Sequence, residues 1–171
     1  MPFRRNTGFT LVELMITIAV LAVMLAIGFP SFQSVLRSNR IATATNEMIA
    51  SMSLARSEAI KNTHGTGVCA STAGASCDGA SWGDGWLVWD DTNGDGALDD
   101  GETVLRFTAG NPKVSGDDAD LTIAYDARGR RRAAADQVVM LRPDECGSQP
   151  LQRSLLINRT GQIKVTKGPC P

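Results

Sequence analysis

The chain has 171 residues, of which 43% are hydrophobic, with 17 glycines, 7 prolines and a net charge of −1. This length has room for one globular domain and one long helix, and the apolar content excludes a chain that is disordered throughout. The charge is unevenly distributed: residues 62–105 carry no lysine or arginine, whereas residues 127–171 carry nine basic residues. This pattern predicts a head with one acidic end and one basic end.

The N-terminus is a short basic segment followed by a long apolar run. Arg4 and Arg5 precede Gly8, and the run from Leu14 to Phe29 carries no charge. As a helix, residues 9–29 would reach about 32 Å, close to the thickness of the hydrocarbon core of a bilayer. The two arginines favour a cytoplasmic N-terminus, with the rest of the chain outside.

A secretory signal peptide is the ordinary alternative for this segment. Residues Ala26–Gly28 fit a small-x-small cleavage site. Glu13 argues against that alternative, because burying a carboxylate at the edge of an apolar run costs roughly 3 kcal/mol unless a charge pairs with it. A disposable leader has no need of such a residue.

The string Gly8-Phe9-Thr10-Leu11-Val12-Glu13 resembles the processing site of type IV prepilins. The resemblance implies that a prepilin peptidase removes residues 1–8 by cutting between Gly8 and Phe9, and that the Phe9 amine is then N-methylated. Residues 9–29 would be retained as a transmembrane and filament-core helix. In this family the acid that corresponds to Glu13 pairs with the N-terminal amine of a neighbouring subunit during assembly.

A helical pattern continues through residues 30–62. Apolar residues recur there at intervals of three and four: Ile41, Ala44, Met48, Met52, Ala55 and Ala59. This stripe predicts a helix that packs on a sheet. Pro30 predicts a kink or a melted turn, because it cannot donate a hydrogen bond to the carbonyl of Ala26. Residues Asn62–Gly67 predict the end of the helix.

Residues 63–171 predict a head of short antiparallel strands, because apolar runs alternate there with turn residues. The expected strands are Trp86–Trp89, Thr103–Phe107, Leu121–Tyr125, Val138–Leu141, Ser154–Ile157 and Gln162–Val165. Asn158–Gly161 predicts a hairpin turn between the last two. The expected fold class is α+β, a type IV pilin-like fold in which a long N-terminal helix packs on an antiparallel sheet.

Four cysteines, Cys69, Cys77, Cys146 and Cys170, lie in the head. An even number downstream of an export signal favours two disulfides. Sequence neighbours would pair as Cys69–Cys77 and Cys146–Cys170, although three connectivities are open. A four-cysteine zinc site is the competing hypothesis, but such sites usually supply their ligands in close pairs.

Several segments of the head resemble the GspH/FimT family of type IV minor pilins and pseudopilins. They are Arg56–Ala59, Val68-Cys69, Trp82 with Gly85–Val88, the loop Asp91–Gly96, and Leu155–Val165. The resemblance implies a non-enzymatic subunit that primes or caps a type IV pilus at its tip, with other major and minor pilins as partners. It would be held in the inner membrane with a periplasmic head, then displayed on the cell surface. A minor pseudopilin of type II secretion is the alternative.

The acidic loop after Trp89 satisfies the calcium pattern D-x-[DN]-x-[DN]-G-x5-E. The candidate ligands are Asp91, Asn93, Asp95, Asp99 and Glu102. The competing hypothesis is a plain hairpin turn, because Asn-Gly-Asp-Gly is typical of turns and the flanks predict strands, whereas an EF-hand has helices. The expected function requires no cofactor, and calcium is the one candidate ligand of this loop.

Basic residues concentrate near the C-terminus, where guanidinium groups could bind the phosphates of double-stranded DNA. The candidate contacts are Arg128, Arg130, Arg131, Arg132, Arg159, Lys164 and Lys167. Some FimT-like proteins take up DNA through a Gly-Arg-x-Arg element near the C-terminus, but Gly161–Lys164 departs from that element here. A DNA-binding minor pilin for natural transformation and a solvated turn are therefore both open.

Catalytic machinery is not evident in the sequence. His64 is the single histidine, so a Ser-His-Asp or Cys-His arrangement would have to use it, at a predicted helix end. The carboxylates cluster in a turn-rich loop and not in an apolar pocket that would separate their pKa values. An enzyme is the least favoured class.

Overall fold

The computed structural model describes residues 8–117, 122–147 and 149–170. The leader residues 1–7 and Leu121, the first residue of one expected strand, lie outside this range. The elements are α1 (Leu11–Asn62), β1 (Gly65–Ala70), a 3-10 turn η1 (Trp82–Asp84), β2 (Gly85–Asp91), β3 (Thr103–Ala109), β4 (Val114–Gly116), β5 (Ile123–Tyr125), β6 (Gln137–Pro143), β7 (Gln152–Ile157) and β8 (Ile163–Gly168). The chain forms two compact units, with the division between Leu36 and Arg37.

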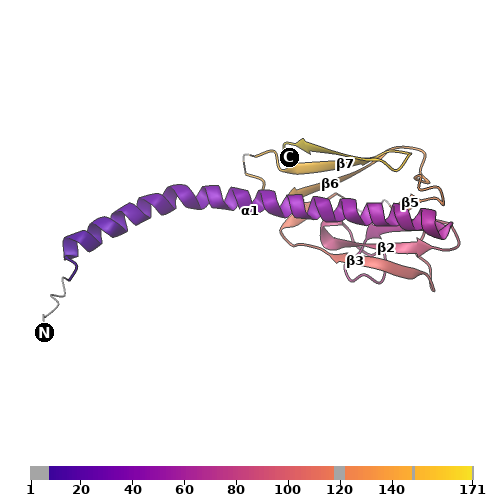
Figure 1. Ribbon diagram of the computed structural model, residues 1–171, viewed down its shortest axis with the longest axis horizontal. Helices are drawn as coiled ribbons and strands as arrows, with labels where there is room; N and C mark the ends of the chain where they lie inside the picture. The colour runs from indigo at the N-terminus through magenta and orange to yellow at the C-terminus, as the bar shows by residue number, and fades with distance from the viewer. Residues whose placement is uncertain (1–7, 118–121, 148, 171) are drawn as a thin grey trace, which may run out of the picture. The chain divides into compact units, whose positions relative to one another are not determined.

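The long helix α1 is continuous from Leu11 to Asn62 (Figure 1). It runs through Pro30 without a break, so the expected melted turn does not form. The helix ends at Asn62 as predicted, but β1 already begins at Gly65, inside the segment expected to be a turn. Thr63, with a φ of 59°, makes the change of direction between the two elements.

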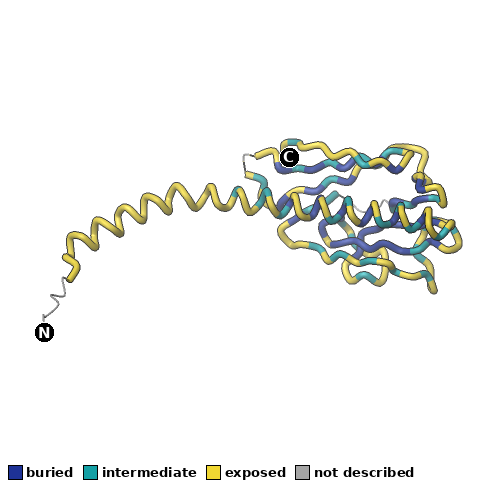
Figure 2. The backbone as a smooth tube through the Cα atoms, in the orientation of Figure 1, coloured by how far each residue is buried: buried dark blue, intermediate teal, exposed yellow. Residues whose placement is uncertain are grey.

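The apolar stripe on the second half of α1 is confirmed as a core surface. Ile41, Met48, Met52, Ala55 and Ala59 are fully buried, and Ala44 is 8% exposed. In Figure 2 the buried part of the backbone is concentrated in the strands of the head and on this portion of the helix. Spacing alone therefore identified the side of the helix that the sheets cover.

The head contains two antiparallel sheets instead of the single one expected. One has the strand order β3-β2-β1-β5 and the other β4-β6-β7-β8. The expected strands within the described residues all form, and the predicted hairpin joins β7 to β8 with Ile157 opposite Ile163. Strand β4 was not predicted. It has three residues, and its register with β6 places Ser115 opposite Arg142.

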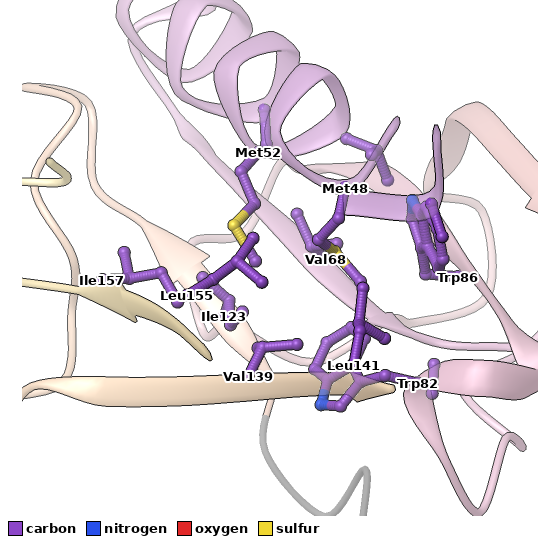
Figure 3. Close-up of a cluster of buried hydrophobic side chains, with 14 of the residues drawn as sticks. Met48, Met52, Val68, Trp82, Trp86, Ile123, Val139, Leu141, Leu155 and Ile157 are labelled. Atoms are coloured by element: carbon purple, nitrogen blue, oxygen red, sulfur yellow. The ribbon is translucent and has the colours of Figure 1, made fainter. Parts of the chain in front are cut away.

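One core lies where α1 and both sheets meet (Figure 3). Met48 and Met52 of α1 pack with Val68 and Ile123 of the first sheet, and with Leu155 of the second. The hydroxyl of Thr66 donates to the carbonyl of Ala55 at 2.7 Å, which joins β1 directly to the helix. The helix therefore holds the two sheets together.

Loops cover the other face of the first sheet. Cys69, Leu87 and Trp89 form a small buried cluster there, with Leu98 packed against it. Disulfide bonds join Cys69 to Cys77 and Cys146 to Cys170, which is the sequence-neighbour pairing. The first disulfide ties a loop over the cluster, and the second ties the end of β8 to the loop that follows β6.

Candidate assembly and ligand-binding sites

The expected processing site lies at the start of α1. Gly8 and Phe9 precede the helix, and Phe9 is 83% exposed. The hydroxyl of Thr10 accepts a hydrogen bond from the backbone N–H of Glu13 at 3.2 Å, so Thr10 caps the helix. The Thr-x-x-Glu spacing is the sequence signal by which this cap could have been predicted. The cap places the Glu13 carboxylate in the first turn, where the helix dipole favours a negative charge.

The first unit exposes an apolar helical surface. Its large aliphatic side chains are between 36% and 74% exposed, including Leu11 at 73%, Val20 at 49% and Ile27 at 74%. Helix α1 has the length and apolar composition to cross a membrane, with a mean hydropathy of 2.5 over one 18-residue window, none of it buried. Such a surface needs a bilayer or other apolar helices around it.

The acidic loop is closed by its own hydrogen bonds. The Asp91 carboxylate accepts from Gly96 N, Asn93 Oδ1 from Asp95 N, and Asp95 Oδ1 from Ala97 N. The two carboxylate oxygens of Glu102 accept from Thr92 N and Asp99 N. Side chains that cap backbone amides in this way are typical of Asx-type turns.

These contacts bear on the calcium hypothesis. The loop joins β2 to β3, so strands flank it as predicted. The carbonyl of Ala97, which in the calcium pattern stands where a backbone carbonyl binds the ion, accepts a hydrogen bond from Trp89 Nε1 at 3.1 Å. Within the described residues, no group of three or more His, Cys, Asp or Glu side chains is arranged to hold a metal ion. The structure therefore accounts for the shape of the loop by hydrogen bonding alone.

Arg131, expected at the surface as a DNA contact, is buried. It is 3% exposed, and its Nη1 donates to the carbonyl of Ile157 at 2.7 Å. Burial lowers the pKa of the guanidinium and also raises the pKa of Tyr125, its partner in an isolated β-bridge, to about 12. Arg153, another member of the basic segment, is 7% exposed and donates to the carbonyls of Pro150 and Gln152. These two arginines have structural roles that the density of positive charge did not reveal.

Two further arginines of the segment are engaged in ion pairs. Arg130 pairs with Asp126 at 3.2 Å. Burial pushes the pKa of Asp126 upward, but hydrogen bonds from the backbone amides of Arg130 and Arg128 outweigh it and hold the pKa below its usual value. Arg132 pairs with Asp91 of the acidic loop at 3.4 Å. The prediction that acidic and basic segments occupy opposite ends of the head is therefore wrong at this point.

The remaining candidate DNA contacts are exposed: Arg128, Arg159, Lys164 and Lys167. Arg128 and Arg159 lie in neighbouring loops, since the backbone N–H of Arg131 donates to the carbonyl of Arg159. Lys164 and Lys167 lie on β8, the edge strand of the second sheet. The structure thus divides the predicted basic cluster into a buried part, an ion-paired part and an exposed part.

Arg56, one of the residues on which the family resemblance rests, joins α1 to the β7–β8 hairpin. Its Nη1 donates to the carbonyl of Gly161 at 3.3 Å. Gly161 has a φ of 77°, and a Cβ there would lie 2.6 Å from the carbonyl oxygen of Gly129. Only glycine fits between these loops. No local sequence signal indicates this contact, because its partners are 105 residues apart.

Comparisons with known proteins agree with this architecture. Residues 44–161 match the family model described as type II transport protein GspH, and residues 3–29 match the prokaryotic N-terminal methylation motif. No curated protein sequence matches the chain.

The fold is similar to two crystal forms of the type IV minor pilin FimU of Pseudomonas aeruginosa. The first has a TM-score of 0.55 and 19% sequence identity, covering 75% of this chain and 89% of that one. The second has a TM-score of 0.53 at the same identity, covering 73% and 91%. With the long apolar helix and the antiparallel head, these matches show a type IV pilin fold. The chain belongs to the GspH/FimT family of type IV minor pilins and pseudopilins.

Proposed function

We propose that this chain is a structural minor pilin of a type IV pilus, with its head in the complex that primes or caps the filament at the tip. The exposed apolar surface of the first half of α1 supports this function best. Such a helix is stable in the inner membrane and equally stable when packed among the helices of other pilins in a filament core. Pilins are structural proteins, and we therefore propose no catalytic role for this chain.

In this proposal the carboxylate of Glu13 pairs with the N-terminal amine of a neighbouring subunit during assembly. After cleavage between Gly8 and Phe9 by a prepilin peptidase, the Phe9 amine would begin the apolar helix. A positive amine and a negative carboxylate are each costly in an apolar core, and pairing across two subunits offsets that cost. The register in which one helix binds the next would then be the one that brings Glu13 to the amine of its neighbour.

Substitution of Glu13 tests this mechanism. Glu13→Ala removes the carboxylate but keeps the backbone N–H that Thr10 caps, so helix formation is preserved. We expect the variant to accumulate in the membrane and to be lost from sheared filaments. Glu58→Ala, a change of the same kind near the end of α1, is the matched control and should enter filaments normally. Normal incorporation of Glu13→Ala would refute the mechanism.

A minor pseudopilin of type II secretion is the second candidate. The description of the matching family model, a type II transport protein, favours it. The two functions use the same helix and the same charge pairing, and they differ in the machine that assembles the subunit. Deletion of the gene separates them: loss of surface pili supports the first function, and loss of protein secretion with normal pili supports the second.

A further inference from the structure

A groove of about 410 Å³ lies between α1 and the β7–β8 hairpin. Ile49, Ile60 and Ile163 supply apolar walls, and Arg56 is the one charged residue that lines it. Ile60 is 49% exposed although its side chain is large and aliphatic. Concave apolar surfaces with a single polar group are typical of binding sites for partners.

The guanidinium in this groove has no acidic partner among the described residues. Arg56 donates to the carbonyl of Gly161 and makes no ion pair with any described residue. Gly161 lies against Arg56 and Tyr125: a Cβ there would lie 3.3 Å from Arg56 Nε and 3.3 Å from the ring of Tyr125, whose backbone pairs with that of Arg131. Arg131 is also outside ion-pair distance of any described acid, and its Nε and Nη2 are buried without a hydrogen bond. Arg56 therefore contributes to the groove lining a positive charge that no described carboxylate neutralises.

We infer that this groove binds a segment of another pilin subunit that carries a carboxylate next to an aliphatic side chain. The isoleucines would cover the aliphatic group, and Arg56 would receive the carboxylate through charged hydrogen bonds. Because the partner is a pilin, the inference rests on the proposed function.

The character of the groove favours a peptide over DNA. Duplex phosphates are bound by several exposed basic side chains spread along a surface. Here a single arginine lies among isoleucines, and the exposed lysines of β8 do not line the groove. An arginine in an apolar recess is instead a typical anchor of protein–protein interfaces.

The chemistry can be tested on the full chain in detergent micelles by isotope-edited NMR. The probes are the peptides acetyl-Leu-Glu-amide and acetyl-Leu-Gln-amide, and a short DNA duplex. We expect the first peptide to shift the amide signals of Gly161, Gln162 and Ile163, and the uncharged peptide to bind about tenfold more weakly, the effect of losing one charged hydrogen bond. Equal binding of the two peptides, binding of neither, or shifts with the duplex alone would overturn the inference.

A variant that fills the groove tests its role in the filament. Ser53 is exposed and lines the groove, so Ser53→Phe blocks it while leaving Arg56 and the core in place. Ala50→Phe, at an exposed position of α1 outside the groove lining, is the matched control. We expect Ser53→Phe to lose peptide binding and to be depleted from sheared filaments, and Ala50→Phe to keep both. If Ser53→Phe enters filaments like the native chain, the groove is not a docking site, and the outcome of Glu13→Ala still decides the proposed function separately.

Discussion

Arg132 Nη2 lies 3.4 Å from Asp91 Oδ2, and this pair joins the arginine-rich segment to the first residue of the acidic loop. The carboxylate is fully buried, whereas the side chain of Arg132 is 33% exposed. Gly94, with a φ of 76°, lets the loop pass beside the guanidinium, since a Cβ there would lie 3.1 Å from Nη2. The pair therefore holds two loops together that are distant in sequence.

Substitution of Arg132 measures how much this ion pair contributes to the stability of the protein. Arg132→Ala is expected to destabilise the protein by about 2 kcal/mol, less than the roughly 3 to 5 kcal/mol of a wholly buried pair because Arg132 is partly hydrated. Unfolding of the full chain in detergent, followed by tryptophan fluorescence, measures the change. Arg128→Ala removes an exposed arginine of the same segment and should stay within about 0.5 kcal/mol of the native value. Equal effects of the two substitutions would contradict the structural role of the pair.

Arg131 is expected to matter for folding. Arg131→Ala removes the 2.7 Å hydrogen bond that the buried guanidinium donates to the carbonyl of Ile157. The expected loss of stability is about 1 to 3 kcal/mol. The same unfolding measurement checks it, and an unchanged midpoint would show that the buried position of this side chain contributes nothing.

DNA uptake, the third candidate function, would require the exposed basic residues to bind phosphates. They are Arg128, Arg159, Lys164 and Lys167. A DNA-binding chain should lose affinity when Lys164 and Lys167 are changed to Ala, and its salt slope should fall by about 2, one for each phosphate contact. A binding titration of the full chain with labelled duplex at several salt concentrations measures both quantities. Asp126 pairs with Arg130, so Arg130→Ala is a useful comparison and should have a smaller effect. Absence of binding at low salt would exclude this function.

A buried hydrogen bond between α1 and β2 offers a third stability test. Trp86 Nε1 donates to Ser51 Oγ at 3.0 Å, and both residues are buried. Ser51→Ala leaves the indole N–H unpaired and should cost about 1 to 3 kcal/mol. Ser57→Ala, at an exposed position of the same helix, should be close to neutral. Similar unfolding midpoints for both variants would show that the helix and the sheet do not depend on this contact.

Calcium is expected to leave the stability of the chain unchanged. One side-chain oxygen of each of four loop residues already accepts a hydrogen bond from a backbone amide of the loop, so the loop keeps its shape without a metal; the residues are Asp91, Asn93, Asp95 and Glu102. The melting temperature of the full chain with about 1 mM calcium or with a chelator is the measurement. A rise in melting temperature that Asp95→Asn abolishes would show that the loop does bind the ion.

The sequence predicted most of the fold because its signals are local. The stripe from Ile41 to Ala59 identified the buried side of α1, and the Asn158–Gly161 turn identified the last hairpin. Strand β4 was not predicted because a strand of three residues is too short to show an alternation of apolar and polar residues. Its partner β6 is also distant in the sequence: Val114 pairs with Pro143. The division of the strands into two sheets was not predicted either, because it depends on pairings between strands that are far apart in the sequence, such as β4 with β6.

For the candidate sites, the amino-acid sequence by itself determined the processing motif, Glu13 at the start of the helix, and the family. These features depend on residues that are neighbours in the chain. Only the tertiary structure decided that Arg131 is buried, that Arg132 pairs with Asp91, and that Arg56 lines an apolar groove. The reason is physical: the burial and the partner of a charged side chain depend on which distant segments pack around it, and charge density along the chain contains no information about that packing.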